Sequence, residues 1–455
     1  MSIRVSSNQM VYGYQKQLND ANTRQTTLLE QGDGSKLHRP SDAPVDYSKF
    51  IRYDASLNEN EQYTNNVDNA ISWMKTSDSA LVNMTAIQTT FKEKTIAAAN
   101  DTNNTVDMAA IGKEMMAEIQ ELISLGNTMQ GDRYVFGGQR DLTKPFELSE
   151  DKIDRGLAKT LDVNQEAYFS GEYGSEDTGS LHQMLRLQDD AGNQYYLNTK
   201  TGDLFTEDFV ENGYKDIVAQ NAKAVVKQTD RAGVIESFVP DSTGKAAETV
   251  STYFKNTGEI RTETNAEGKV VPKTITAKIN DADVTLNFVT VHQQLATYTG
   301  DNNHISMVKK NGTTEPTADA VNVTGPQIFG CDIFDDPDSG NAYSGTAMLN
   351  EMLTVHTKVV SDDHRWLVTD GQTVSDTAHA VTVETETFLG ARQQLYTSAK
   401  TMLGNQNETI TSDITDVGST DVAKLAVRLM QEQTIYNMSL SLGARILPQS
   451  LADYL

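Results

Sequence analysis

The sequence predicts a mixed α and β fold: a long helical coiled-coil rod built from both chain ends, with an antiparallel β-rich region inserted between them. Near both ends apolar residues recur at steps of three and four, which is typical of coiled-coil helices. Residues 147–344 instead carry short β-branched and aromatic runs between turn residues, which is typical of antiparallel hairpins. Negative charge concentrates there, with 33 acidic against 18 basic residues in 147–360, a net −15 of the chain's −25.

The first 31 residues contain no proline and one glycine, and they predict a single helix. Its thin apolar stripe consists of Val11, Tyr14, Leu18, Ala21 and Leu28, with Gln25 in the remaining slot. A hinge with Gly32, Gly34, Pro40 and Pro44 follows this helix. Ser41 and Asp42 are candidate caps for the next helix, and Pro44 suits its first turn.

Two further stripes predict a long helical hairpin around the polar loop 100–104. The first stripe contains Val67, Ile71, Met74, Leu81, Met84 and Phe91, and the second contains Met108, Ile111, Met115, Ile119, Leu122, Leu125 and Met129.

The last part of the chain predicts a returning helix and a terminal helix. Residues 376–447 contain no proline, and Leu389, Tyr396, Leu403, Ile410 and Val417 fall seven apart. After Gly418 a new face begins, marked by Val422, Leu425, Leu429, Tyr436 and Ile446, and the chain closes with Leu451 and Leu455. A lone helix with so thin a stripe is marginal in water. Two such stripes, each beyond a hinge, favour packing between subunits.

Composition excludes several function classes. The acidic balance disfavours nucleic-acid binding, because the phosphate backbone would be repelled. The single cysteine, Cys331, leaves no intramolecular disulfide, and no apolar run is long enough to span a membrane. The N-terminus lacks the apolar region of a secretory signal, so the protein either stays in the cytoplasm or leaves by a route without one. No metal or cofactor motif is present, and His356 and His364 near Asp362 and Asp363 favour solvated surface.

Three segments then carry a resemblance to the flagellin superfamily. Residues 34–44 resemble the hinge that follows the first helix in that family. Residues 132–138, with Tyr134, Phe136 and Gly138, followed by Pro145-Phe146, are similar to the segment of the hook–filament junction subunits where the helical hairpin meets the variable domain. Residues 421–455 resemble the family's closing helix. The matches fall in the right order at the right ends of the chain.

The resemblance implies three domains and an assembly role. Residues 1–40 and 418–455 would form a terminal coiled coil, 41–146 and 345–417 a helical rod, and 147–344 an outer insert of one or two subdomains. The implied assembly interface consists of Val11, Tyr14, Leu18, Ala21, Leu425, Leu429, Tyr436, Ile446, Leu451 and Leu455. Pro40, Asp42 and Pro44 would fix the joint between coiled coil and rod.

The function implied by the resemblance is that of a structural subunit, not an enzyme, at the junction between flagellar hook and filament. Its partners would be copies of itself, a hook-associated protein on the hook side, flagellin on the filament side, and an export chaperone on the C-terminal helix. It would be exported without a cleaved signal peptide to the extracellular flagellum, and it would bind neither nucleic acid nor membrane.

Three alternatives remain open from the sequence. The nearest is a filament flagellin, against which the 134–138 segment favours the junction subunit. A flagellin-like protease with its active site in the insert would need a zinc motif such as H-E-x-x-H, and none is present. A coiled-coil surface adhesin would explain the helices and acidic strands but not the three segments.

Overall fold

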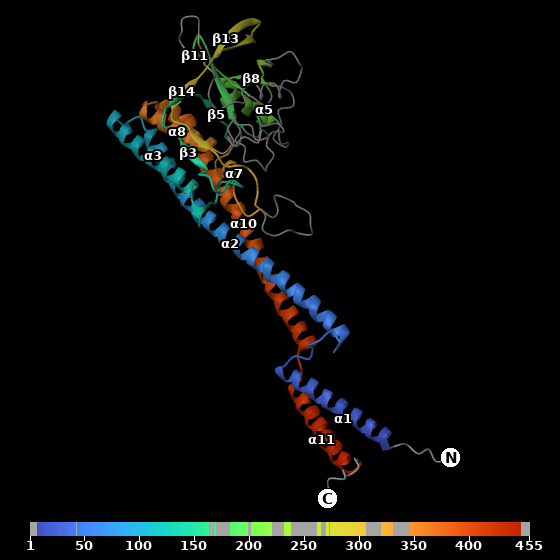
Figure 1. Cartoon of the computed structure of the whole chain (residues 1–455). Coiled ribbons are helices and arrows are strands. Elements are labelled where there is room, and N and C mark those ends of the chain that lie inside the picture. Colours follow the sequence, from blue (N-terminus) through green and yellow to red (C-terminus); the bar gives the residue numbers. More distant parts are fainter. Residues whose placement is uncertain are drawn as a thin grey trace. The chain divides into compact units, whose positions relative to one another are not determined.

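Long helices occur near both ends of the sequence, and the strands lie between them in sequence, which confirms the predicted fold class (Figure 1). The computed structural model describes residues 7–41, 43–162, 165, 168–169, 183–198, 202–220, 232–237, 262–264, 270–272, 274–305, 320–330 and 346–446. Two compact units can be distinguished, one of residues 1–67 and 398–455 and one of 68–397. The three-domain division stays a prediction. No described helix combines the length and apolarity needed to cross a membrane.

The long helices follow the predicted stripes. They are α1 (Ser7–Glu30), α2 (Pro44–Ala98), α3 (Thr105–Gly126), α10 (Gln372–Gly418) and α11 (Val422–Ile446). Helix α8 (Ala347–Val360) is a further long helix, for which the sequence analysis predicted no stripe. Leu389, Tyr396, Leu403 and Ile410, the heptad of α10, are all buried. Shorter helical pieces also occur: η1 (Gln31–Asp33), η2 (Phe209–Gly213), α5 (Tyr214–Gln220), α7 (Gly325–Phe329), α9 (His364–Trp366) and η3 (Leu367–Gly371).

The helical hairpin of α2 and α3 turns at the predicted polar loop. Asn104 caps α3, because its side-chain oxygen accepts hydrogen bonds from the backbone N–H groups of Val106 and Asp107. One predicted stripe member was placed wrongly: α3 ends at Gly126, and Met129 lies in a short strand with its side chain 46% exposed. The phenyl ring of Phe146 lies against Gly126, and Asn127 accepts the Phe146 N–H, so the chain leaves the helix there.

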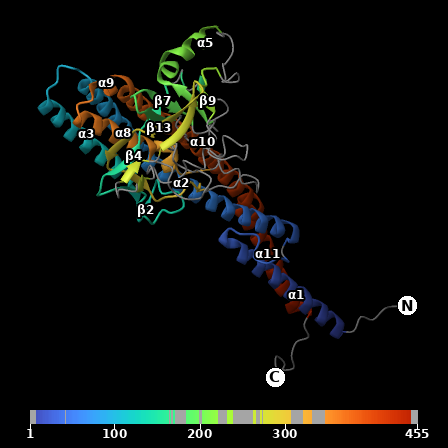
Figure 2. The same cartoon turned by 90° about the horizontal axis from the view of Figure 1, so that it is seen from above.

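Hydroxyl and amide side chains join α2 to α10 within the 68–397 unit. The amide of Gln88 donates to the hydroxyl of Thr382 over 2.9 Å, and Thr85 donates to Glu386 over 3.1 Å. Helices α3 and α8 lie side by side on this unit (Figure 2). Within this unit the helices therefore pack as a bundle, and the strands are inserted between α3 and α8 in sequence.

The main sheet of the insert is antiparallel and curls toward closure. Its strand order is β12 (Thr274–Ile279), β13 (Ala282–Phe288), β6 (Gln183–Asp189), β7 (Gln194–Leu197), β8 (Asp203–Thr206) and β9 (Glu236–Ser237), with β5 (Ala158–Thr160) also pairing with β6. The two end strands, β12 and β9, lie close together, and the backbone N–H of Lys278 in β12 donates to the carboxylate of Glu236 in β9. Alternate residues such as Leu185, Leu187 and Leu286 share one buried cluster.

Four strand pairs complete the β structure. They are β1 (Met129–Gln130) with β2 (Arg133–Tyr134), β3 (Phe146–Leu148) with β15 (Ala296–Tyr298), β4 (Ile153–Gly156) with β14 (Thr290–Gln293), and β10 (Thr262–Thr264) with β11 (Val270–Pro272). Residues 252–254, whose aromatic run in the 147–344 region also predicts the first strand of a hairpin, lie outside the described residues.

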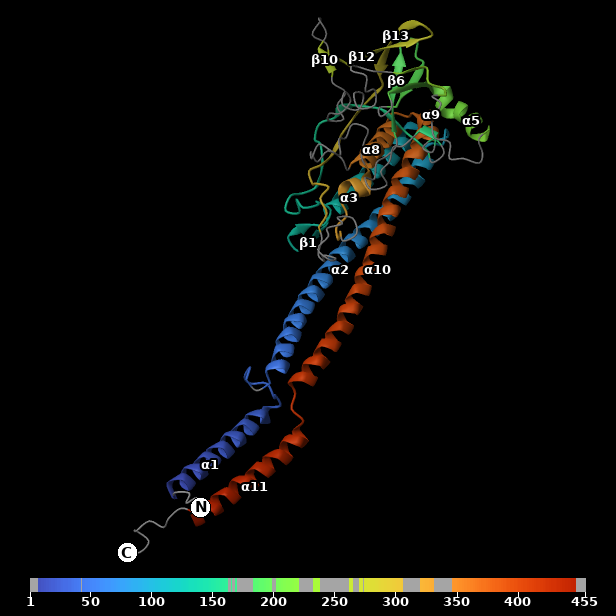
Figure 3. The ribbon, with the colours of Figure 1, turned by 90° about the vertical axis from the view of Figure 1, so that its right-hand side faces the viewer.

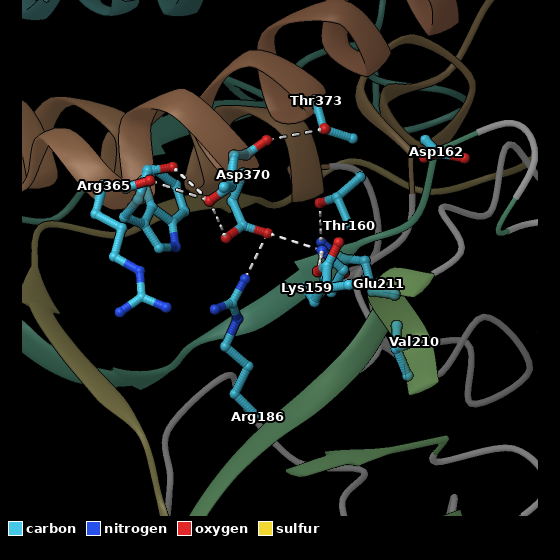
Figure 4. Close-up of polar contacts among 12 residues, drawn as sticks. Lys159, Thr160, Asp162, Arg186, Val210, Glu211, Arg365, Asp370 and Thr373 are labelled. Carbon is cyan, nitrogen blue, oxygen red and sulfur yellow. Dashed lines mark hydrogen bonds and ion pairs between the residues drawn. The ribbon is translucent and has the colours of Figure 1, made fainter. Parts of the chain in front are cut away.

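A buried charge cluster joins the sheet to the helices (Figure 4). The carboxylate of Asp370 in η3 lies 3.2 Å from the Lys159 amine of β5 and 2.5 Å from the Arg186 guanidinium of β6. Glu211 of η2 makes a second contact with Lys159. Burial alone would raise the pKa of Asp370, but the charges of Arg186 and Lys159 hold it below its ordinary value. The carboxylate is therefore ionised at neutral pH.

Candidate assembly site at the paired chain ends

The two terminal helices pair with each other within one chain. Helices α1 and α11 lie side by side in the 1–67 and 398–455 unit (Figure 3). On α1, the residues between 12 and 30 that are not exposed are Gly13, Tyr14, Leu18, Ala21, Gln25 and Leu28. On α11, those between 422 and 441 are Leu425, Leu429, Glu432, Tyr436 and Ser439. Apart from Gly13, both sets follow steps of four and three, which is the seam of a coiled coil.

This seam is thin. Only Ala21 and Leu425 are buried, at 2% and 8% exposure, and the other members are half-buried. Across the seam the guanidinium of Arg24 lies 3.3 Å from the carboxylate of Glu432. Exposed ion pairs of this kind contribute about 1 kcal/mol or less. The pair therefore has a defined register but little buried apolar area within one chain.

The predicted interface residues divide into two groups. Tyr14, Leu18, Ala21, Leu425, Leu429 and Tyr436 lie in the seam between α1 and α11 of the same chain. The side chains of Val11 and Ile446, and all of Leu451 and Leu455, lie outside what the structure describes. Val422, expected on the new face, is 68% exposed at the first turn of α11. The seam residues first join the two ends of one subunit, and their role between subunits stays a prediction.

A second apolar face on α11 was missed from the sequence. Val427, Met430 and Met438 are 52%, 62% and 66% exposed. At about 100° per residue they fall on the side of the helix opposite Leu425. The signal was present in their spacing of three and eight residues, but the seam residues dominate the same pattern. This outer face is available for a contact beyond the chain.

The joint between the terminal and the longer helices is fixed by paired backbone. The N–H of Lys36 donates to the carbonyl of Gly418, and the N–H of Thr420 donates to the carbonyl of Gly34, each over 2.9 Å. Gly34 has a φ of +95°, a backbone conformation that glycine adopts at little cost. The segment between α1 and α2 and the segment between α10 and α11 are therefore joined by an antiparallel bridge between Ser35 and Ser419.

The predicted joint residues, Pro40, Asp42 and Pro44, fall between the end of α1 and the first turn of α2 in sequence. Pro44 begins α2, where its fixed φ suits the first helical turn, and Pro40 is exposed in the turn before it. Asp42 lies outside the described residues, so its capping role stays a prediction.

The family segment at 134–138 forms a tight turn against residues 298–301. The Tyr298 hydroxyl donates to the carbonyl of Phe136 over 2.8 Å, and the Phe136 side chain is fully buried. Gly138 has a φ of +68°, and a Cβ built on it would clash with a carboxylate oxygen of Asp301. That carboxylate accepts the Gln139 N–H over 2.7 Å. Residue 138 must therefore be glycine. The turn at 134–138 holds the end of β15 and the residues after it against the end of the α2–α3 hairpin.

His356 and His364, which the sequence analysis weighed near two aspartates, both lie in the described part of the chain. No group of three or more His, Cys, Asp or Glu side chains there could hold a metal ion. The Nδ1–H of His364 donates to the carbonyl of Ala98 over 3.0 Å, and its Nε2 lies 3.1 Å from the carboxylate of Asp362. His356 is half-buried, and burial lowers its pKa. The sequence analysis favoured solvated surface for His356, and this was wrong, because its side chain lies near Gly112 of α3.

Comparison with known proteins places this arrangement in a class. Residues 5–140 match the bacterial flagellin N-terminal helical region. This match includes two of the three segments and confirms that the chain, with its paired terminal helices, is similar to flagellins.

Within this class the chain is similar to flagellar hook-associated protein 3. The Escherichia coli (strain K12) protein of that name is 28% identical over 155 residues, which cover 33% of this chain and 48% of the relative. B-type flagellin of Pseudomonas aeruginosa is 24% identical over 176 residues, covering 38% of this chain and 35% of the relative. The crystal structure of flagellar hook-associated protein 3 from Legionella pneumophila covers 81% of this chain and 98% of that chain, with 11% identity and a TM-score of 0.36. The chain thus spans about half or less of these curated relatives' length.

Proposed function

We propose that this protein is a structural subunit of the bacterial flagellum that forms the junction between hook and filament. The observation that carries the proposal is the pairing of α1 with α11 in a chain whose N-terminal part matches flagellin. The relatives named flagellar hook-associated protein 3 support a place at the junction.

Assembly would use the outer face of the helix pair. The seam buries too little apolar area to hold one subunit firmly, and the exposed side chains of Val427, Met430 and Met438 would pack on helices of neighbouring copies. Many weak contacts of this kind sum to a stable ring or tube. The roles assigned to the chain ends beyond residue 446 belong to the same proposal.

Partners and location follow from this role. The subunit would contact a hook-associated protein on one side and flagellin on the other, and a chaperone would hold the C-terminal helix before export without a cleaved signal. It would act outside the cell by packing and would catalyse no reaction.

Variants of the outer face test this function. Val427→Glu should leave α1 and α11 paired, because residue 427 is already 52% exposed, but it should block filament attachment in a strain whose own gene is deleted. Gln433→Glu, at an exposed position of α11 that lies off the outer face, is the matched control. Removing residues 446–455 should also block assembly while the 68–397 unit stays folded. Normal swimming and attached filaments in the Val427→Glu strain would contradict the proposal.

A filament flagellin is the second candidate, because relatives named flagellin also match. Stoichiometry separates the two: a flagellin would be abundant along the whole filament, whereas a junction subunit would be confined to its base.

A further inference from the structure

The methionine side chains of the described residues divide by exposure into two main groups. In one group each side chain is at most 1% exposed, and its members are Met74, Met84, Met108, Met115, Met184, Met348 and Met352. In the other group the side chains are exposed: Met129 at 46%, Met402 at 63%, Met430 at 62% and Met438 at 66%. Met116 is intermediate. Because a peroxide must reach the sulfur atom to oxidise it, the exposed group is open to oxidation and the buried group is shielded.

Two of the exposed methionines share one face of one helix. Met430 and Met438 both lie on the outer face of α11, eight residues and about 12 Å apart along the helix axis. The outer face consists of these two side chains and Val427, while Leu425 on the opposite side of α11 is 8% exposed. Methionine therefore supplies two of the three apolar side chains on this face.

Oxidation changes the polarity of such a side chain without breaking the chain. A lone pair of the thioether sulfur attacks one oxygen of hydrogen peroxide, and the O–O bond breaks. The proton on the transferred oxygen passes to the departing hydroxide, which leaves as water. The sulfur loses two electrons to the peroxide and becomes a sulfoxide. The sulfoxide is polar, so burying it in an apolar contact without a hydrogen-bond donor is unfavourable.

We propose that Met430 and Met438 form a site of reversible oxidation by peroxide, and that oxidation stops the outer face of α11 from packing on other helices. The inference rests on the proposed function, since that function gives the outer face its role. After oxidation Val427 is the only apolar side chain left on this face. The seam with α1 stays intact, because the two methionines lie on the side of α11 away from it. Methionine sulfoxide reductases restore the thioether, and with it the apolar face.

Peptide mass spectrometry of the purified full-length chain tests the site itself. During brief treatment with dilute hydrogen peroxide, Met430 and Met438 should each gain one oxygen atom several-fold faster than the buried methionines. Both should lose it again when the reductases for the two sulfoxide epimers are added with a reductant. If Met430 and Met438 react as slowly as Met74, the proposal is overturned.

Filament attachment tests the consequence of oxidation. The purified chain, untreated or oxidised, is added to cells whose own gene is deleted, and filaments are counted by microscopy. The oxidised chain should give several-fold fewer filaments than the untreated chain, and reductase treatment should recover them. A chain with Met430→Leu and Met438→Leu, compared with its own untreated sample, should lose nothing on oxidation. Met402→Leu, which removes an exposed methionine of α10, is the matched control and should lose as much as the wild type.

Failure of the junction role and failure of the oxidation site are separately visible. If the untreated chain restores no filaments, the proposed function fails and the outer face loses its role with it. If the untreated chain restores filaments and the oxidised chain restores as many, only the oxidation site is refuted. The same holds if peroxide inactivates the double leucine variant as strongly as the wild type. Faster amide hydrogen exchange in α1 after oxidation would also refute it, since the seam and not the outer face would then be disturbed.

Discussion

Replacing Asp370 by asparagine should destabilise the 68–397 unit more than any single surface change. The Asp370 carboxylate is 8% exposed and lies between Lys159 and Arg186, which are 6% and 5% exposed. Without the carboxylate, Lys159 keeps its contact with Glu211, which is 38% exposed, and the buried guanidinium of Arg186 loses its ion pair with Asp370. Breaking a buried ion pair by removing one partner costs about 3–5 kcal/mol. We expect a loss of this size in the free energy of unfolding.

Chemical denaturation followed by tryptophan fluorescence measures this loss. The chain has two tryptophans, Trp73 and Trp366, and both are buried in the same unit as Asp370. The matched control is Asp376→Asn, the same substitution at an ion pair with Lys92 in which both side chains are about half exposed. Surface pairs are worth about 1 kcal/mol or less, so the control should change little. If Asp370→Asn and the control agree within about 1 kcal/mol, the argument from burial and charge is refuted.

The pH dependence gives a second reading of the same carboxylate. Its pKa is held below the ordinary aspartate value of 3.8. A group with a lowered folded-state pKa contributes stability above its unfolded pKa and loses it as the pH falls through the folded value. The wild-type free energy of unfolding should therefore fall more steeply below pH 3.8 than that of Asp370→Asn. Parallel curves would show that Asp370 is not stabilised by its two cations.

Three further predictions concern the turn and the helix pair. Gly138→Ala should cost several kcal/mol by denaturation, because its Cβ would meet Asp301, whereas Gly131→Ala, at a φ of +66° in open space, should cost only about 1–2 kcal/mol; equal losses would count against the clash. Ala21→Glu should separate α1 from α11 and speed amide hydrogen exchange in both helices, since Ala21 is 2% exposed. If the amides of both helices stay as protected as in the wild type, the seam between α1 and α11 is refuted. Val427→Glu should leave that protection intact, and faster exchange would show that residue 427 supports the seam.

The seam of the terminal helices was predictable from the sequence because coiled-coil packing repeats locally. Tyr14, Leu18 and Ala21 lie on one side of α1 by spacing alone, and the structure places them against α11. The outer face was missed because Val427, Met430 and Met438 are only three residues, and the longer pattern of the seam dominates the sequence of α11. Which stripe meets the same chain and which meets a neighbour depends on the fold, and residue spacing contains no such information.

The charge cluster could not be predicted for a different reason. Lys159, Arg186 and Asp370 are separated by up to 211 residues, and each alone resembles an ordinary surface charge. Only the placement of β5 and β6 against η3 brings them together and removes them from water. The end of α3 at Gly126 likewise depends on the Phe146 ring, 20 residues away, which no local pattern indicates.

Imaging flagella from a strain that lacks this gene tests the central claim most directly. With the gene deleted, cells should carry hooks without filaments, and the full-length chain supplied in trans should restore filaments. Antibody against the chain should then label only the boundary between hook and filament. Normal filaments in the deletion strain, or label along the whole filament, would contradict a junction role.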